Sequence, residues 1–146
     1  MISFETAKAL KDAGLVWEPK LGDLFNTLEC IEAENTSFGI WDEEMQEAYD
    51  TPGADIDGMH KGSLWLPRLD QLLAEIVKNT WGCRLSVLWI EDFPIGYECL
   101  LSRREETEDG KWDVYAQRFV MASPEEAAAQ ALLWILRREV CSCESQ

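Results

Sequence analysis

Apolar residues recur at helical spacing in three segments of the chain, and each segment predicts a helix. The first covers Phe4–Ala13 and the second opens at Pro67 and carries its apolar stripe to Val77. The third follows Ser123-Pro124-Glu125-Glu126. Ser123 can accept a hydrogen bond from a free backbone N–H, and Glu126 completes a capping box with it. Proline fits the first helical position. The stripe of this last helix continues to Leu136.

The second half of the chain also holds three runs that predict strands, Leu85–Ile90, Gly96–Ser102 and Trp112–Met121. The first run is apolar at nearly every position, which predicts a strand that is buried on both faces or lies at the centre of the sheet. A polar stretch that ends in Asp109-Gly110 lies before the third run and predicts a hairpin turn, because glycine accepts positive φ without a Cβ clash.

Weaker patterns organise the first half. A strand is predicted over Asp23–Ile31, and Ser37–Trp41 is its predicted hairpin partner with Asn35 in the turn. An acidic helical turn is predicted over Asp42–Tyr49. The glycines and the proline of Asp50–Lys61 predict a mobile loop.

The expected order of elements is therefore helix, two strands, helix, three strands, helix. Three amphipathic helices and mainly antiparallel strands predict an α+β fold, a layered sandwich of one sheet of about five strands with three helices. At this length one domain is expected, over residues 1–140, and the pattern-free residues 141–146 are expected to fray.

The charge distribution says more about possible binding partners than the overall composition does. The formal net charge is −15, and from Leu21 to His60 there are eleven acidic residues and no Lys or Arg. Such a surface repels phosphate backbones, so we expect no direct nucleic-acid binding. Two outcomes are open for this acidic stretch: bases from elsewhere fold back onto it, or the charge stays solvated and faces outward.

No apolar run approaches the roughly 20 residues that span a bilayer, and no signal pattern opens the sequence. We therefore expect a cytoplasmic protein without membrane contact. The five cysteines are an odd number, which predicts free thiols rather than a disulfide framework.

Three helix starts carry a resemblance to a known class of domain. They are Phe4–Gly14, the helix that opens at Pro67, and Ser-Pro-Glu-Glu-Ala at Ser123–Ala127. Together they resemble small uncharacterised proteins of bacteria and their phages of the phage "ABA sandwich" type, in which helices lie on both sides of a sheet. The resemblance implies that fold and a phage or prophage setting. It implies no reaction and no site residues.

Candidate ligand and catalytic groups each have a plainer interpretation. Asp55-Ile56-Asp57-Gly58 suggests calcium, but an EF-hand register with Gly58 at position 6 puts Gly53 at 1 and Leu64 at 12, and neither is a ligand. A solvated acidic loop is the better interpretation.

The thiols and the carboxylates give no stronger site. Cys141 and Cys143 are too close in sequence for a zinc knuckle, and Cys83 and Cys99 flank the first hairpin without a second spaced pair. Glu91-Asp92 lies at a strand end but has no visible histidine or basic partner to tune it. We therefore predict no catalytic, cofactor or metal site.

Five residues are predicted to contact a partner, since tryptophan is enriched at binding hot spots and acidic side chains attract basic surfaces: Trp41, Glu43, Glu44, Glu47 and Trp65. The first hypothesis is thus a small, acidic, non-enzymatic protein-interaction protein, with the oligomeric state left open. One alternative is an anionic decoy that blocks a basic nucleic-acid-binding protein. The other is a carboxylate hydrolase that uses a divalent metal.

Overall fold

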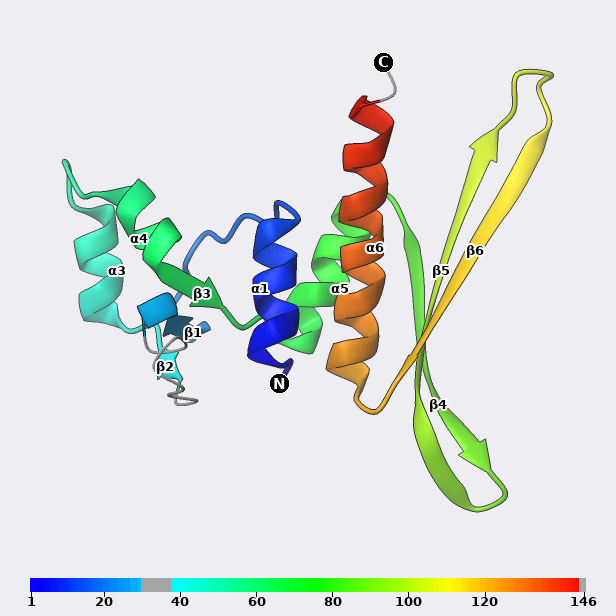
Figure 1. Ribbon diagram of the computed structural model, residues 1–146, viewed down its shortest axis with the longest axis horizontal. Helices are drawn as coiled ribbons and strands as arrows, with labels where there is room; N and C mark the ends of the chain where they lie inside the picture. Colours follow the sequence, from blue (N-terminus) through cyan, green and yellow to red (C-terminus); the bar gives the residue numbers. More distant parts are fainter. Residues whose placement is uncertain (30–37, 145–146) are drawn as a thin grey trace. The chain divides into compact units, whose positions relative to one another are not determined.

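The computed structural model describes residues 1–29 and 38–144, with side chains described as far as Glu139 (Figure 1). The chain forms two compact units, an N-terminal unit of Ile2–Pro67 and a C-terminal unit of Arg68–Gln146 that includes Met1. Within the described residues there are five helices and two separate three-stranded antiparallel sheets. The predicted α+β class is confirmed. The single five-stranded sheet with three helices is wrong, because each half of the chain pairs its strands only within itself.

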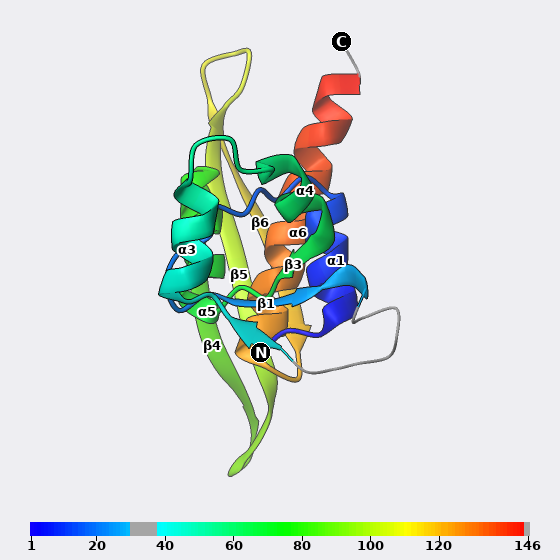
Figure 2. The same cartoon turned by 90° about the vertical axis from the view of Figure 1, so that its left-hand side faces the viewer.

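The described part of the N-terminal unit, residues 2–29 and 38–67, has three short strands and three helices. They are α1 (Phe4–Asp12), β1 (Leu24–Thr27), β2 (Gly39–Ile40), α3 (Glu43–Asp50), α4 (Ile56–Gly62) and β3 (Ser63–Trp65). Strand β1 lies between β2 and β3 and pairs antiparallel with both (Figure 2). The predicted pairing of the first two strands is thus confirmed, and so is the acidic helix. The first strand is shorter than predicted, because it ends at Thr27 and residues 28–29 are helical. The rest of the two predicted strands and the turn at Asn35, residues 30–37, lie outside the described residues.

The prediction of a loop over residues 50–61 is wrong for its second half, where α4 forms. Asp55 caps this helix by accepting a 3.0 Å hydrogen bond from the backbone N–H of Gly58. The capped helix leads directly into β3, a strand too short to leave a periodic pattern in the sequence.

Aromatic side chains build the core of this unit. Trp17, Phe25 and Trp41 are buried together, with Trp65 and Tyr49 packed against them. The indole N–H of Trp17 donates a 2.9 Å hydrogen bond to the buried carboxylate of Asp23, which satisfies both groups. Three of the seven tryptophans of the sequence lie in this unit, which partly explains how so few residues build a core.

The C-terminal unit has the predicted order of elements, α5 (Leu69–Lys78), β4 (Gly82–Ile90), β5 (Phe93–Glu106), β6 (Trp112–Met121) and α6 (Pro124–Glu144). Gly110 has φ of 78° in the β5–β6 turn, as the Asp-Gly pattern predicts. Ser123 Oγ accepts a 3.1 Å hydrogen bond from the backbone N–H of Glu126, which confirms the predicted cap of α6. The helix continues to Glu144, four residues into the segment that the sequence predicts to fray.

Strand β4 is an edge strand, since the order in this sheet is β4-β5-β6. The prediction that Leu85–Ile90 is buried on both faces or lies at the centre of the sheet is therefore wrong. Trp89, at a register shift next to the β4–β5 turn, is 59% exposed. The apolar run reflects an exposed surface, which periodicity cannot distinguish from a buried strand.

One face of this sheet packs against α6. Cys99 and Leu101 on β5 are fully buried on this face, and Phe119 on β6 contacts Trp134 of α6 with ring centroids 6.2 Å apart. Trp134 also packs edge-on against Trp81 at 5.4 Å. Of the helices in the described part of the chain, none has the length and apolar character needed to cross a bilayer.

Candidate binding sites

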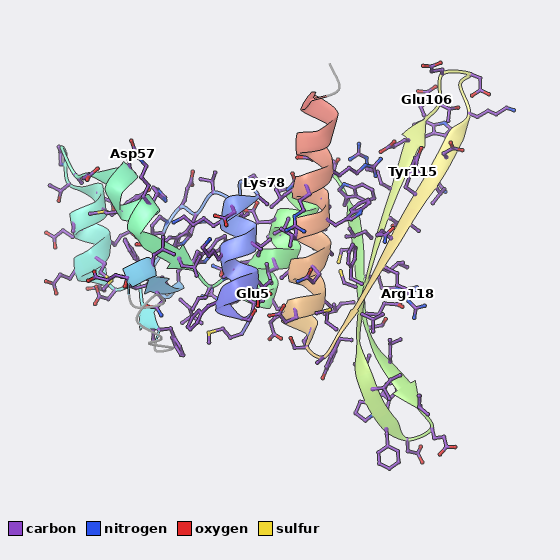
Figure 3. All side chains as sticks on the ribbon, in the orientation of Figure 1. Glu5, Asp57, Lys78, Glu106, Tyr115 and Arg118 are labelled. Atoms are coloured by element: carbon purple, nitrogen blue, oxygen red, sulfur yellow. The ribbon has the colours of Figure 1, made fainter. Side chains whose placement is uncertain are left out.

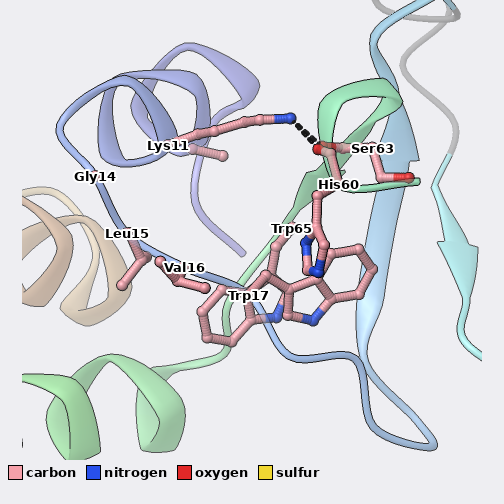
Figure 4. Close-up of a pocket in the computed structure, with 9 residues that line it drawn as sticks. Lys11, Gly14, Leu15, Val16, Trp17, His60, Ser63 and Trp65 are labelled. Carbon is pink, nitrogen blue, oxygen red and sulfur yellow. Dashed lines mark hydrogen bonds between the residues drawn. The ribbon is translucent and has the colours of Figure 1, made fainter. Parts of the chain in front are cut away.

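A pocket of about 260 Å³ opens within the N-terminal unit (Figure 4). Its wall comes from α1 and the chain that follows it, and from α4 and β3, with these lining residues: Ala7, Lys11, Gly14, Leu15, Val16, Trp17, His60, Ser63 and Trp65. The indole rings of Trp17 and Trp65 are nearly parallel, at an interplanar angle of 8° and a centroid separation of 6.4 Å. The pocket is therefore mainly apolar and carries two aromatic rings in its wall.

Lys11 fixes one side of the pocket. Its ammonium group donates hydrogen bonds to the backbone carbonyls of His60, Lys61 and Ser63, at the end of α4 and the start of β3. A cation at a helix C-terminus also interacts favourably with the helix dipole. Partial burial lowers the pKa of Lys11 below its ordinary value, while the carboxylate of Asp12 acts in the opposite direction. Because three carbonyls occupy its three donors, Lys11 positions α4 and has no donor left for a ligand.

His60 supplies a polar group to the pocket. Its Nε2 lies 3.1 Å from the hydroxyl of Tyr49, and the two rings pack edge-on. Within the described residues its Nδ1 has no hydrogen-bond partner. Trp65 contributes only apolar surface, since its Nε1 is buried and finds no acceptor in the described part of the chain.

The acidic helix α3 is held against the aromatic core. Trp41 Nε1 donates a 2.9 Å hydrogen bond to Gln46 Oε1, and Trp41 packs edge-on against Tyr49 at 6.0 Å. Asp42 caps the helix by accepting a hydrogen bond from the backbone N–H of Met45. The helix therefore has a fixed inner face, although none of its residues is fully buried.

The outer side of α3 carries three of the five predicted partner-binding residues. Glu43, Glu44 and Glu47 are exposed, and among the described residues of the N-terminal unit no Lys or Arg forms an ion pair with them. Within this unit the charge thus faces outward, which is one of the two outcomes that the sequence leaves open. Asp57 of α4 adds a further exposed carboxylate, labelled in Figure 3.

The two predicted tryptophan anchors lie elsewhere. Trp41 is only 6% exposed and belongs to the core, and Trp65 lines the pocket. The structure therefore separates the five predicted residues into an acidic surface on α3, a core position and a pocket wall. Sequence reasoning missed the roles of Lys11 and His60, and no local pattern around either residue could have indicated them.

The other candidate groups have structural roles in the described residues. Asp55 is a helix cap, and Glu91 and Asp92 form the exposed β4–β5 turn. No group of three His, Cys, Asp or Glu side chains lies close enough together to hold a metal ion, in the part of the chain that is described.

The two thiols that flank the first hairpin do come together. Cys83 Sγ and Cys99 Sγ lie 3.2 Å apart across β4 and β5, and both thiols are free. Their hydrogen bond lowers the pKa of Cys83. The same hydrogen bond, together with burial, raises the pKa of Cys99.

No described element of the C-terminal unit covers the face of its sheet that points away from α6. The pairing register puts alternate residues of the three strands on this uncovered face, which we define by the side chains Arg84, Leu88, Glu98, Leu100, Arg104, Trp112, Val114, Arg118 and Val120. Trp112 and Val114 are 63% and 65% exposed. Figure 3 labels Arg118 of this face on β6, and also Glu106 at the end of β5, which lies on the same side of the sheet because it pairs with Trp112.

No protein-family model matches this chain, and neither a curated protein nor a solved structure is significantly similar to it.

Proposed function

We propose that this chain is a non-enzymatic protein-interaction protein, and that its partner docks on the uncovered face of the C-terminal sheet. The observation that supports this proposal is the exposure of Trp112 and Val114 on a face that no described element of that unit covers. Contiguous exposed apolar surface of this kind marks interaction sites in soluble proteins, and aromatic side chains are enriched there.

The chemistry of this face indicates what it would accept. Arg84, Arg104 and Arg118 alternate with the apolar side chains, and Arg118 forms an ion pair with the nearly buried Glu98. The edges of the sheet, β4 and β6, also leave backbone N–H and C=O groups without a neighbouring strand in the described residues. A partner with an apolar surface, acidic groups and a free strand edge fits these features.

Site-specific photo-crosslinking tests the proposal. A photoreactive amino acid at Val114 should form a discrete adduct in cells, identified by mass spectrometry as a partner protein or as a second copy of this chain. The same residue at Ala74, which is exposed on α5, is the matched control and should form no such adduct.

A Trp112→Asp change in the Val114 probe variant should abolish the adduct, because a carboxylate would then be desolvated on docking. If both probe positions gave the same adducts, or if Trp112→Asp left the adduct unchanged, the uncovered face would not be a docking surface.

The anionic decoy is a second candidate, and the anchoring of α3 supports it. A helix fixed through Trp41 and Tyr49 presents Glu43, Glu44 and Glu47 without an ion-pair partner among the described residues of its unit. A preorganised array of carboxylates can imitate backbone phosphates and speed encounter with a basic protein.

Pull-downs from host lysate test the decoy role, with Glu43, Glu44 and Glu47 all changed to Gln as the comparison. Basic proteins should bind the unchanged chain, lose affinity as salt rises, and be lost from the variant. Recovery of the same proteins by both forms would exclude α3 as a recognition surface.

The phage or prophage setting also stays a proposal, supported by the likeness of three helix starts. The genes that neighbour the coding sequence test it directly. A metal-dependent hydrolase gains no support from the described residues, where carboxylates do not gather into a ligand set. Elemental analysis of the purified protein tests that alternative.

A further inference from the structure

We propose that the pocket of the N-terminal unit binds a small, neutral aromatic compound that carries one hydroxyl or similar hydrogen-bonding group. This inference is independent of the docking surface on the C-terminal sheet, because every lining residue belongs to Ile2–Pro67. It assigns a ligand class to the pocket from its volume, its walls and the ring nitrogen Nδ1 of His60.

The volume sets the size of the ligand. About 260 Å³ lies just below the range of pockets that hold drug-sized molecules, so one or two fused rings fit and larger compounds do not. Trp17 in the wall of the pocket also belongs to the buried core with Phe25 and Trp41, so this part of the wall is already formed. A preformed site loses less affinity to ordering on binding.

The walls favour an aromatic ring. Trp17 and Trp65 lie nearly parallel at 6.4 Å, and Trp65 presents ring surface because its N–H is buried. Aromatic pairs gain about 0.5–1.5 kcal/mol beyond the burial of their area. A saturated ring of equal size gains only the burial, so the two tryptophans discriminate between them.

The polar group of the ligand is set by His60 and Lys11. The three donors of Lys11 are occupied by backbone carbonyls, so an anionic group would find no donor there. Nε2 of His60 forms a hydrogen bond with the hydroxyl of Tyr49, and this contact selects the tautomer of the ring. The tautomer in turn decides whether Nδ1 donates or accepts a hydrogen bond. A hydroxyl can do either, so it matches both tautomers.

Nuclear magnetic resonance with three probes of similar size tests the proposal. The probes are p-cresol, toluene and cyclohexanol, and the readout is the indole N–H signals of Trp17 and Trp65. We expect p-cresol to shift both signals saturably and toluene to bind roughly three- to ten-fold more weakly, as expected for the loss of one hydrogen bond. Cyclohexanol should bind more weakly than p-cresol by a similar factor.

Two variants at one position separate the ligand contact from folding. His60→Leu should reduce p-cresol binding to the level of toluene, and His60→Gln should retain part of the difference. The buried Trp41 N–H signal reports in each case that the unit is folded.

Three outcomes would overturn the inference. They are no shift with any probe, equal affinity for p-cresol and cyclohexanol, or larger shifts at the exposed Trp89 and Trp112 than at the pocket. The last result would indicate non-specific binding to the apolar sheet surface.

Discussion

The backbone N–H of Thr80 donates a 2.9 Å hydrogen bond to the carbonyl of Val77 and thereby closes the end of α5. The N–H of Trp81 reaches back to Ile76 in the same way, which completes a Schellman motif. The motif needs a residue with positive φ, normally glycine, yet Thr80 occupies that position with φ of 66°. A β-branched side chain in this conformation is strained.

Thr80→Gly should therefore stabilise the C-terminal unit. The release of strain, about 1–3 kcal/mol, exceeds the entropic cost of a new glycine, about 0.5–1 kcal/mol, so we expect a net gain of about 1 kcal/mol. Denaturant unfolding measures it. The matched control is Asn79→Gly, where φ is an ordinary −84° and a side-chain hydrogen bond to Glu75 is lost, so stability should fall. If Thr80→Gly and Asn79→Gly both stabilised the unit, the effect at Thr80 could not be attributed to the strain of its positive φ.

The cap of α6 makes a separate contribution. Ser123 Oγ satisfies the N–H of Glu126, so Ser123→Ala should cost about 1 kcal/mol of unfolding free energy. Ser123→Thr retains the acceptor and should cost much less. An unchanged denaturation midpoint for Ser123→Ala would mean that the helix obtains its first-turn stability elsewhere.

Cys83 should be the more reactive of the two paired thiols. Its hydrogen bond with Cys99 lowers its pKa, and it is half-buried whereas Cys99 is fully buried. Alkylation by iodoacetamide, followed by peptide mass mapping against pH, should give Cys83 a midpoint below its ordinary pKa of 9.0.

Removal of the Cys99 thiol tests whether its hydrogen bond is the cause of the lowered pKa of Cys83. Cys99→Ala should move the midpoint of Cys83 upward, because the hydrogen bond to its thiolate is lost. Ser86→Ala, on the opposite face of β4, is the control and should leave the profile in place. If Cys99→Ala left the pH profile of Cys83 alkylation unchanged, the two sulfurs would not interact in solution.

The elements that the sequence predicts well are those with local causes. The start of α6 depends on Ser123-Pro124 and a neighbouring glutamate, and the β5–β6 turn on Asp109-Gly110, so neither requires knowledge of the rest of the fold. Strand β3 is different. Its three residues form a strand only because Phe25, Asn26 and Thr27 pair with them from nearly 40 residues away.

The same distinction between local and long-range causes explains which features of the candidate sites the sequence did not predict. The apolar run Leu85–Ile90 has one pattern for a buried central strand and for an exposed edge, and only the order of strands decides between them. The pocket requires Lys11 to reach carbonyls of His60 and Ser63, about 50 residues along the chain. The exposure of Glu43 was predictable from charge alone, whereas the burial of Trp41 depends on packing.

The two ends of α3 allow a final prediction about its charge. Glu43 lies in the first turn, where a carboxylate is favoured by the helix dipole, and Asp50 is the last residue, where a carboxylate is disfavoured. Both residues are exposed, and each has Glu47 as a neighbour, four positions after Glu43 and three before Asp50. Repulsion within the acidic surface therefore acts on the two positions to a similar extent.

Glu43→Gln and Asp50→Asn each remove one negative charge, so the general self-repulsion of the unit cancels in their comparison. The asparagine side chain keeps an oxygen that can accept the hydrogen bond from Gln46 Nε2, so what remains is mainly the dipole term, about 0.3–1 kcal/mol of opposite sign at each end. Asp50→Asn should thus be more stable than Glu43→Gln by about 1 kcal/mol at low ionic strength, as measured by denaturant unfolding followed through tryptophan fluorescence. In 1 M salt, where the Debye length is about 3 Å, the difference should shrink. Equal effects of the two changes at low salt would mean that α3 does not persist as a helix in solution. The decoy role would then have no ordered acidic surface to support it.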